Sequence, residues 1–147
     1  MAATSYADRP AAPAAPLPGR YADFALLALR VMAGLLFAQH GAQKLLGWFA
    51  DPATGPMHLP VGSLPWIAGV LELVGGPLIA LGLFTRPVAF LLAGEMAVAY
   101  FMAHAPRGFW PILNHGENVV LYCFAFLLFF AVGAGAYSLD AALRRRA

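Results

Sequence analysis

Four runs of apolar residues, separated by shorter polar segments, dominate this chain. The runs cover residues 22–49, 64–83, 88–104 and 117–137, and each reaches about 17 residues, the minimum for a helix that crosses a bilayer. None shows the residue-by-residue alternation of a membrane-spanning strand. Proline and glycine mark the breaks between the runs. The pattern therefore predicts an all-α membrane protein, a bundle of four transmembrane helices.

Composition supports the same class. Of the 147 residues, 61% are hydrophobic and 11% are charged, whereas soluble domains carry about 25% charged residues. Residues 1–20 are rich in Ala and Pro and lack the apolar core of a secretory signal, so we expect a disordered tail there. We expect one membrane domain over residues 21–147. The single cysteine, Cys123, excludes an intramolecular disulfide and a cysteine-ligated metal site within one chain.

The basic residues predict how the bundle sits in the membrane. One side of a four-span arrangement would carry Arg9, Arg20, Arg86 and Arg144 to Arg146. The other side would carry only Lys44 and Arg107. By the positive-inside rule, both termini are then cytoplasmic. The basic residues form no patch interleaved with aromatic residues, so the net charge of +2 does not predict nucleic-acid binding, and we expect the lipid bilayer to be the main partner.

Small residues recur inside the runs at a spacing that suits close helix packing. Examples are Gly34 and Ala38 in the first run and Gly75 and Gly76 in the second. Small side chains let helix backbones approach one another in lipid, where no hydrophobic force draws them together. We therefore expect a compact bundle, with a dimer face as a further use of these positions.

Charged residues inside the first run form a stripe. On a helix, its members fall within about 40° of one line. They are Arg30, Gly34, Phe37, Gly41 and Lys44, with His40 at the edge. A charge facing lipid costs at least ~2.5 kcal/mol at mid-membrane, so the stripe should face other helices or a wet cavity. Glu72 and Glu95, on the second and third runs, are the carboxylates that could face it.

Counting depth from the cytoplasmic end of each run places Arg30, Glu72 and Glu95 in one middle layer. We expect Arg30 to pair with one carboxylate, such as Glu72, and the other carboxyl to be protonated by desolvation. In the alternative interpretation, the Arg30–Glu72 pair only fixes the helix register. Glu95 is the less secure member, because nine residues separate it from His104 and place the two on opposite faces unless the helix bends near His104.

A second polar layer is expected near the outer end. Its members are His40, Lys44, His104, His115 and Glu117. A metal site there would have suitable ligand types but no diagnostic spacing, so we predict none. A haem bound by His40 and His104 would also need a roomy pocket, which two histidines alone do not indicate. We therefore predict no intrinsic cofactor.

Several short motifs, taken in order, resemble those of a known family. They are Leu29-Arg30, His40-Gly41 and Lys44, then Glu72, Gly75-Gly76, Gly82 and Thr85-Arg86, and finally His104, Gly116-Glu117 and Ser138 to Asp140. Their order over residues 21–145 resembles the DoxX family of small four-span membrane proteins. The resemblance implies a bacterial cytoplasmic (inner) membrane location and a link to quinone-dependent sulfur oxidation and other membrane redox assemblies. It carries over Arg30, His40, Lys44, Glu72, His104 and Glu117 as pocket candidates.

Three functions stay open at this stage. We favour a membrane subunit of a redox complex, in which His40, Lys44 and Arg30 donate hydrogen bonds to a quinone head group. Phe37 and Trp48 would line the slot, and a neutral Glu72 would supply a proton.

The chain has no electron carrier and no self-contained catalytic motif, so a partner redox subunit would act with it, or further copies of the chain in a homo-oligomer. The second hypothesis is a small transporter or proton pathway that uses Glu72, Glu95 and Arg30. The third is a purely structural membrane anchor.

Overall fold

The computed structural model describes residues 19–146, and every regular element in that range is a helix. The helices are α1 (Gly19–Leu46), α2 (Leu64–Leu81), α3 (Thr85–Ala99), α4 (Pro111–Asn114), α5 (Glu117–Val132) and α6 (Leu139–Arg144). Beyond α3, the helix continues through a π-helical turn, Tyr100–His104, and a 3-10 turn, Ala105–Arg107. The tail expected over residues 1–20 lies outside the described residues up to residue 18, whereas Gly19 and Arg20 already belong to α1.

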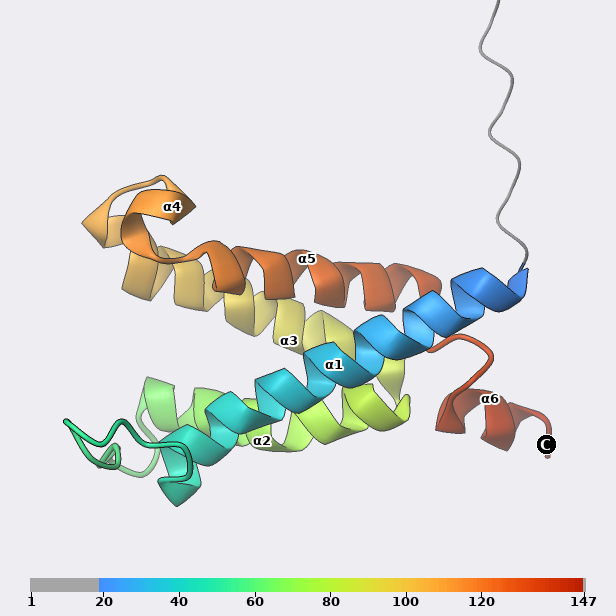
Figure 1. The fold of residues 1–147 in the computed structure, drawn as a ribbon, viewed down its shortest axis with the longest axis horizontal. Coiled ribbons are helices and arrows are strands. Elements are labelled where there is room, and N and C mark those ends of the chain that lie inside the picture. The colour runs from blue at the N-terminus through green and yellow to red at the C-terminus, as the bar shows by residue number, and fades with distance from the viewer. Residues whose placement is uncertain (1–18, 147) are drawn as a thin grey trace, which may run out of the picture.

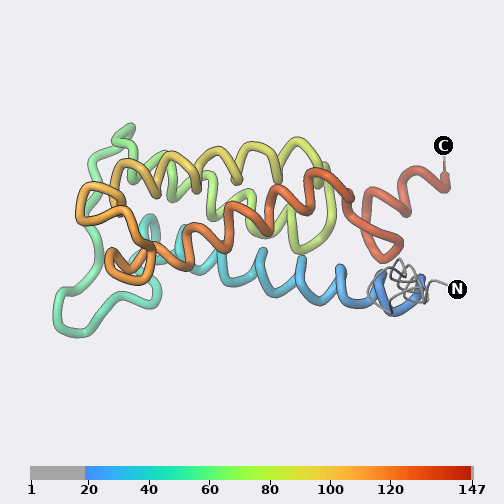
Figure 2. The backbone as a smooth tube through the Cα atoms, turned by 90° about the horizontal axis from the view of Figure 1, so that it is seen from above, coloured from blue at the N-terminus to red at the C-terminus, as the bar shows by residue number. Residues whose placement is uncertain are grey.

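The long helices pack as two pairs. α1 lies along α2, α3 lies along α5, and α2 joins the pairs through its contact with α3 (Figures 1 and 2). By contrast, α1 and α5 touch at few points. The start of α1 and the whole of α6 lie at the same end of the bundle in Figure 2, as an even number of membrane crossings requires. The location of that end in the cytoplasm remains a prediction.

Three helical segments are long and apolar enough to cross a membrane, namely α1, α2 and the continuous helix Thr85–Arg107. The fourth predicted run is shorter than expected, because α5 spans 16 residues and ends at Val132. Gly133 follows with a φ of 81°, a conformation that glycine adopts without strain and that turns the chain out of the helix. The all-helical membrane fold is therefore confirmed, and a fourth crossing by α5 remains a prediction.

Glycines allow α1 and α2 to cross in close contact. A Cβ atom at Gly34 would overlap with the carbonyl oxygen of Gly76, and a Cβ atom at Gly76 would meet the carbonyl oxygen of Gly34 at 2.5 Å. Further along the same antiparallel contact, a Cβ atom at Gly41 would overlap with the backbone of Leu73. The close packing expected from small residues is thus confirmed for this helix pair.

The side chain of Arg30 holds the end of the chain instead of a carboxylate. It is 1% exposed and donates hydrogen bonds to the carbonyl oxygens of Ala134 (2.6 Å) and Tyr137 (2.7 Å), just beyond the end of α5. The predicted Arg30–Glu72 pair is therefore wrong. In the observed register Arg30 lies beside Gly82, and Glu72 is ten residues earlier, about 15 Å along the helix.

Asp140 completes this C-terminal contact. Its carboxylate accepts hydrogen bonds from the backbone N–H groups of Phe84 (2.9 Å) and Thr85 (3.0 Å) at the start of α3. Partial burial alone would raise the pKa of Asp140, but these hydrogen bonds outweigh it and hold the pKa below its usual value. The hydroxyl of Ser138 accepts from the N–H of Ala141 at 3.1 Å, which confirms Ser138 as the N-cap of α6.

Candidate functional site

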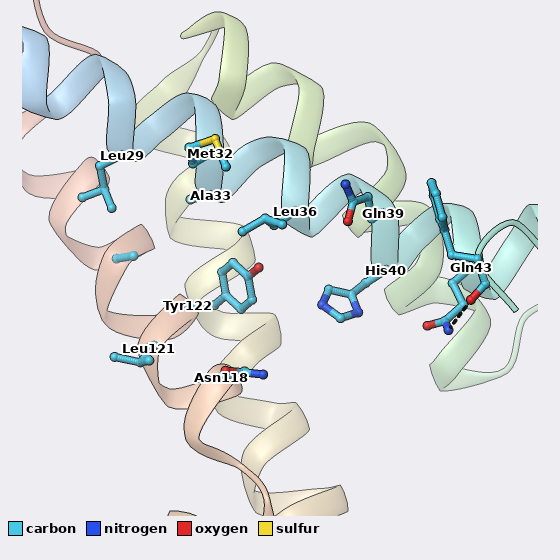
Figure 3. Close-up of a pocket in the computed structure, with 12 residues that line it drawn as sticks. Leu29, Met32, Ala33, Leu36, Gln39, His40, Gln43, Asn118, Leu121 and Tyr122 are labelled. Carbon is cyan, nitrogen blue, oxygen red and sulfur yellow. Dashed lines mark hydrogen bonds between the residues drawn. The ribbon is translucent and has the colours of Figure 1, made fainter. Parts of the chain in front are cut away.

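The helices α1 and α5 make few contacts with each other, and a groove of about 730 Å³ lies between them. Figure 3 shows the lining side chains of both helices facing one another across it. The α1 side contributes Leu29, Met32, Ala33, Leu36, Gln39, His40 and Gln43; Phe49 follows α1, and α5 contributes Asn118, Leu121, Tyr122 and Ala125. The lining changes along the groove from aliphatic residues near Leu29 to polar residues near Gln43.

The polar end of the groove is built from neutral side chains and one imidazole. The rings of His40 and Tyr122 face each other in perpendicular orientation, with centroids 6.3 Å apart. The amide nitrogen of Gln43 donates to the carbonyl oxygen of Phe49 at 3.1 Å, which fixes the loop after α1 against this end. Gln39 and Asn118 complete the polar end, and both are exposed. These groups can both donate and accept hydrogen bonds.

One turn along α1 from His40, Lys44 forms a partly buried ion pair with Glu72. The Nζ atom of Lys44 is 2.6 Å from Oε1 of Glu72, and the Glu72 residue is 3% exposed. A Cβ atom at Gly69 would lie 3.0–3.1 Å from side-chain atoms of Leu45 and Lys44, so Lys44 is level with Gly69, one turn before Glu72 on α2. Lys44, and not Arg30, is the partner of Glu72 because the register of α1 on α2 places Lys44 beside Gly69 and Arg30 beside Gly82.

Glu95 lies in the same interior, on α3. Both of its carboxyl oxygens are buried and have no hydrogen-bond partner among residues 19–146, and the same holds for Oε2 of Glu72. Glu72 and Lys44 are charged neighbours of Glu95, and Lys44 and His40 are neighbours of Glu72. His40, Lys44, Glu72 and Glu95 therefore form one polar cluster, which reaches from the groove into the bundle.

Other residues expected in the site lie elsewhere. Arg30 is at the opposite end of the bundle, and Glu117 is exposed in the first turn of α5. His104 belongs to a separate group of polar contacts, in which its Nδ1 atom is 3.1 Å from the carbonyl oxygen of Asn114. The π-helical turn over Tyr100–His104 departs from regular α-helix at the place where a bend would be needed for Glu95 and His104 to share a face.

The residues expected to line a quinone slot also differ. Phe37 is 1% exposed and packs edge-to-face on Phe126 at 4.8 Å, in the core of the bundle, so it lines no groove. Trp48 is not among the lining residues, whereas its neighbour Phe49 is. Sequence reasoning misses Tyr122 and Asn118, although their spacing of four residues places them on one face of α5.

The described part of the chain contains no cluster of three or more His, Cys, Asp or Glu side chains arranged to hold a metal ion. Cys123 is half-buried, and its thiol donates to the carbonyl oxygen of Ala93 at 3.4 Å. The chemistry that the side chains of the site can perform is hydrogen bonding and proton exchange.

Residues 25–105 match the sequence model of the family described as DoxX, and this segment contains His40, Lys44, Glu72 and Glu95. The chain belongs to the DoxX family. The matched segment covers α1 to α3, so the α5 side of the groove lies outside it.

Relatives of this DoxX protein match more than four-fifths of the chain. An uncharacterized protein of Haemophilus influenzae is 44% identical over 124 residues, which are 82% of this chain and 92% of the relative. The inner membrane protein YphA of Escherichia coli is 32% identical over 142 residues, 82% of this chain and 96% of YphA. The inner membrane protein YqjF of the same organism is 29% identical over 84% of this chain and 95% of YqjF. No solved structure matches this DoxX protein.

The family, the named relatives and the spanning helices together establish where the protein is located. The protein is a multi-pass inner-membrane protein, and its exposed apolar side chains contact the lipid bilayer.

Proposed function

We propose that this DoxX protein is the quinone-binding membrane subunit of a redox complex, with the groove between α1 and α5 as the binding site. The observation that carries the proposal is the change from an aliphatic to a polar lining along one groove. A membrane quinone has the same two parts, an apolar isoprenoid tail and a ring with two carbonyl groups. Ligand sites are typically apolar with a few placed polar groups, and the volume of about 730 Å³ is in their usual range.

The polar end offers the hydrogen-bond donors that two carbonyl oxygens need. His40 approaches from α1 and Tyr122 from α5, so donors are available from opposite walls (Figure 3). Asn118 and Gln39 are further donors beside them. Of the three donors expected from the sequence, only His40 serves here, because Lys44 is bound to Glu72 and Arg30 to backbone carbonyls.

The aliphatic part of the groove suits the tail. Leu29, Met32 and Leu36 on one side face Leu121 on the other. A second, smaller groove of about 390 Å³ continues from Leu29 between the same two helices to Ala22 and Val132. The tail of a long isoprenoid could therefore run along the helix pair from the polar end toward the other end of the bundle.

The test is the quinone content of the protein purified in mild detergent, followed by titration with a benzoquinone or naphthoquinone carrying an isoprenoid tail. Ala125→Trp fills the groove and should abolish binding. Phe124→Trp is the matched control, because Phe124 is 66% exposed and does not line the groove. Tyr122→Phe should weaken binding by up to about tenfold, the value of one hydrogen bond.

A stoichiometric quinone that is lost in folded Ala125→Trp and retained in Phe124→Trp would support the proposal. Absence of bound quinone in the wild type, together with no saturable binding of either quinone, would overturn it and leave the anchor function. Equal binding by both tryptophan variants would also overturn it, because the ligand would then lie outside the groove.

A further inference from the structure

The cluster around Lys44 contains two carboxyl groups and one amine, whereas the buried guanidinium of Arg30 lies away from it, beside Gly82. Glu72 and Glu95 lie on neighbouring helices, and Lys44 is the cation beside them. If both carboxyl groups were ionised while His40 is neutral, the cluster would carry one uncompensated negative charge. A buried charge without a partner costs several kcal/mol in a protein interior, and such groups neutralise instead. One added proton makes the cluster neutral.

The hydrogen-bond pattern indicates which carboxyl group takes the proton. Oε1 of Glu72 accepts from the lysine amine at 2.6 Å, and this contact stabilises Glu72 in its ionised form. Glu95 has no hydrogen-bond partner for either oxygen within the described residues. The remaining oxygen of Glu72, a residue that is 3% exposed, is also free to accept a hydrogen bond in this interior.

The groups that face the cluster come from all four long helices. α1 supplies Lys44 and His40, α2 supplies Glu72, and α3 supplies Glu95 itself. From α5, Tyr122 is the titratable group on which the charge of Glu72 acts. The thiol of Cys123 also lies on α5, but it donates to a backbone carbonyl of α3. His40 is the member of this set that is both basic and exposed in the groove.

We infer that Glu72 and Glu95 form a binding site for one proton inside the bundle, which is loaded and unloaded from the groove through His40. The ligand is a proton, and only N–H and O–H bonds change when it moves from the imidazole to a carboxylate. Imidazole gains and loses a proton near neutral pH, which suits this relay. The proton site depends on the geometry of the cluster and not on the identity of the molecule that fills the groove.

Infrared spectroscopy of the protein in lipid membranes tests the inference. A protonated carboxyl group has a carbonyl stretching band that an ionised carboxylate lacks, and the band moves when the proton is replaced by deuterium. The wild type should show this band at neutral pH. Glu95→Gln should remove it, whereas Glu95→Asp should keep it at a shifted frequency. Glu117→Gln is the control, because Glu117 is exposed on α5 and its replacement should leave the band unchanged.

Two further variants test the sharing of the proton and its route. In Glu72→Gln, Glu95 becomes the carboxylate available to Lys44, so it should ionise and the band should disappear. In His40→Gln, the band should remain, but its deuterium shift should be slower than in the wild type.

The inference would be overturned by a wild type without the band at neutral pH, a measurement that needs no variant. It would also be overturned by a band that persists in Glu95→Gln, or by an exchange rate in His40→Gln equal to that of the wild type.

This test is separate from that of the quinone proposal. A band with these properties in a protein that binds no quinone would support the proton site and remove the quinone. A bound quinone in a protein without the band would support the quinone proposal and overturn the proton site.

Discussion

Replacement of Arg30 by methionine tests whether this residue fastens the C-terminal segment to the bundle or belongs to the site. The guanidinium group donates two hydrogen bonds, at 2.6 and 2.7 Å, to the carbonyl oxygens of Ala134 and Tyr137 beyond α5. A methionine side chain has a similar apolar stem but no donor. Arg30→Met therefore removes both hydrogen bonds while most of the packing of the stem is kept.

Each hydrogen bond from a charged donor contributes about 1.5–3 kcal/mol, so the pair contributes about 3–6 kcal/mol to the attachment of the C-terminal segment. The contact with Ala134 is buried, so water does not replace the lost donor there in Arg30→Met, whereas the contact with Tyr137 is only partly buried and the loss there is smaller. Arg30→Lys retains the charge but not the planar, forked geometry, and should have an intermediate effect.

Hydrogen–deuterium exchange of the protein in detergent is the assay. If the segment opens locally, the amides of α6 should exchange faster by a factor of up to about 10²–10⁴ in Arg30→Met, which is the same free energy expressed as a ratio. The amides of α1 around Gly34 serve as the internal control, because that part of the helix packs on α2 and not on the C-terminal segment. Unchanged exchange in α6 would refute the fastening role. An equal acceleration in all helices would refute its local character.

Three further predictions concern packing and charge. Gly34→Leu should separate α1 from α2 and lower the unfolding temperature in detergent, whereas Gly94→Leu, at a position where a Cβ atom meets nothing within 4 Å, should change it little. Because the pKa of Asp140 is lowered in the folded state, its contribution to stability is present above about pH 4 and is lost as the pH falls further, so Asp140→Asn should flatten the acid side of the stability curve. Lys44→Met should destabilise the protein in denaturant titrations by less than the about 3–5 kcal/mol of a fully buried pair, because Lys44 is partly exposed and Glu72 can take up a proton, and adding Glu72→Leu should recover most of that loss.

The class of the protein can be predicted from the sequence, because a bilayer imposes a length and an apolar composition on every spanning helix. The sequence also predicts the contact between Gly34 and the second helix, since small residues have few other uses at such spacing. The sequence does not predict the correct partner of Arg30. Depth counted from the cytoplasmic end of each apolar run places Arg30 near Glu72, whereas α1 begins at Gly19 and Arg30 lies level with Gly82, at the very end of α2.

The groove is predicted only in part because charge is the strongest signal that an apolar run offers. Gln39 and Asn118 are neutral, and a polar amide in an apolar run carries no strong signal about which helix it faces. Phe37 is expected in the groove and Tyr122 is not, yet the structure reverses these positions. Which aromatic residue faces the opening depends on the rotation of α1 against α5, and that rotation follows from contacts between distant parts of the chain.

The sparse contact between α1 and α5 has a consequence for how any molecule would enter the groove. If α5 crosses the membrane beside α1, as the sequence predicts, the groove between them opens sideways, toward the bilayer. Entry would then occur by lateral diffusion in the plane of the membrane. Occupancy would follow the mole fraction of the ligand among the lipids and not its concentration in water, so an affinity measured in one lipid composition applies to another only after correction for dilution by lipid.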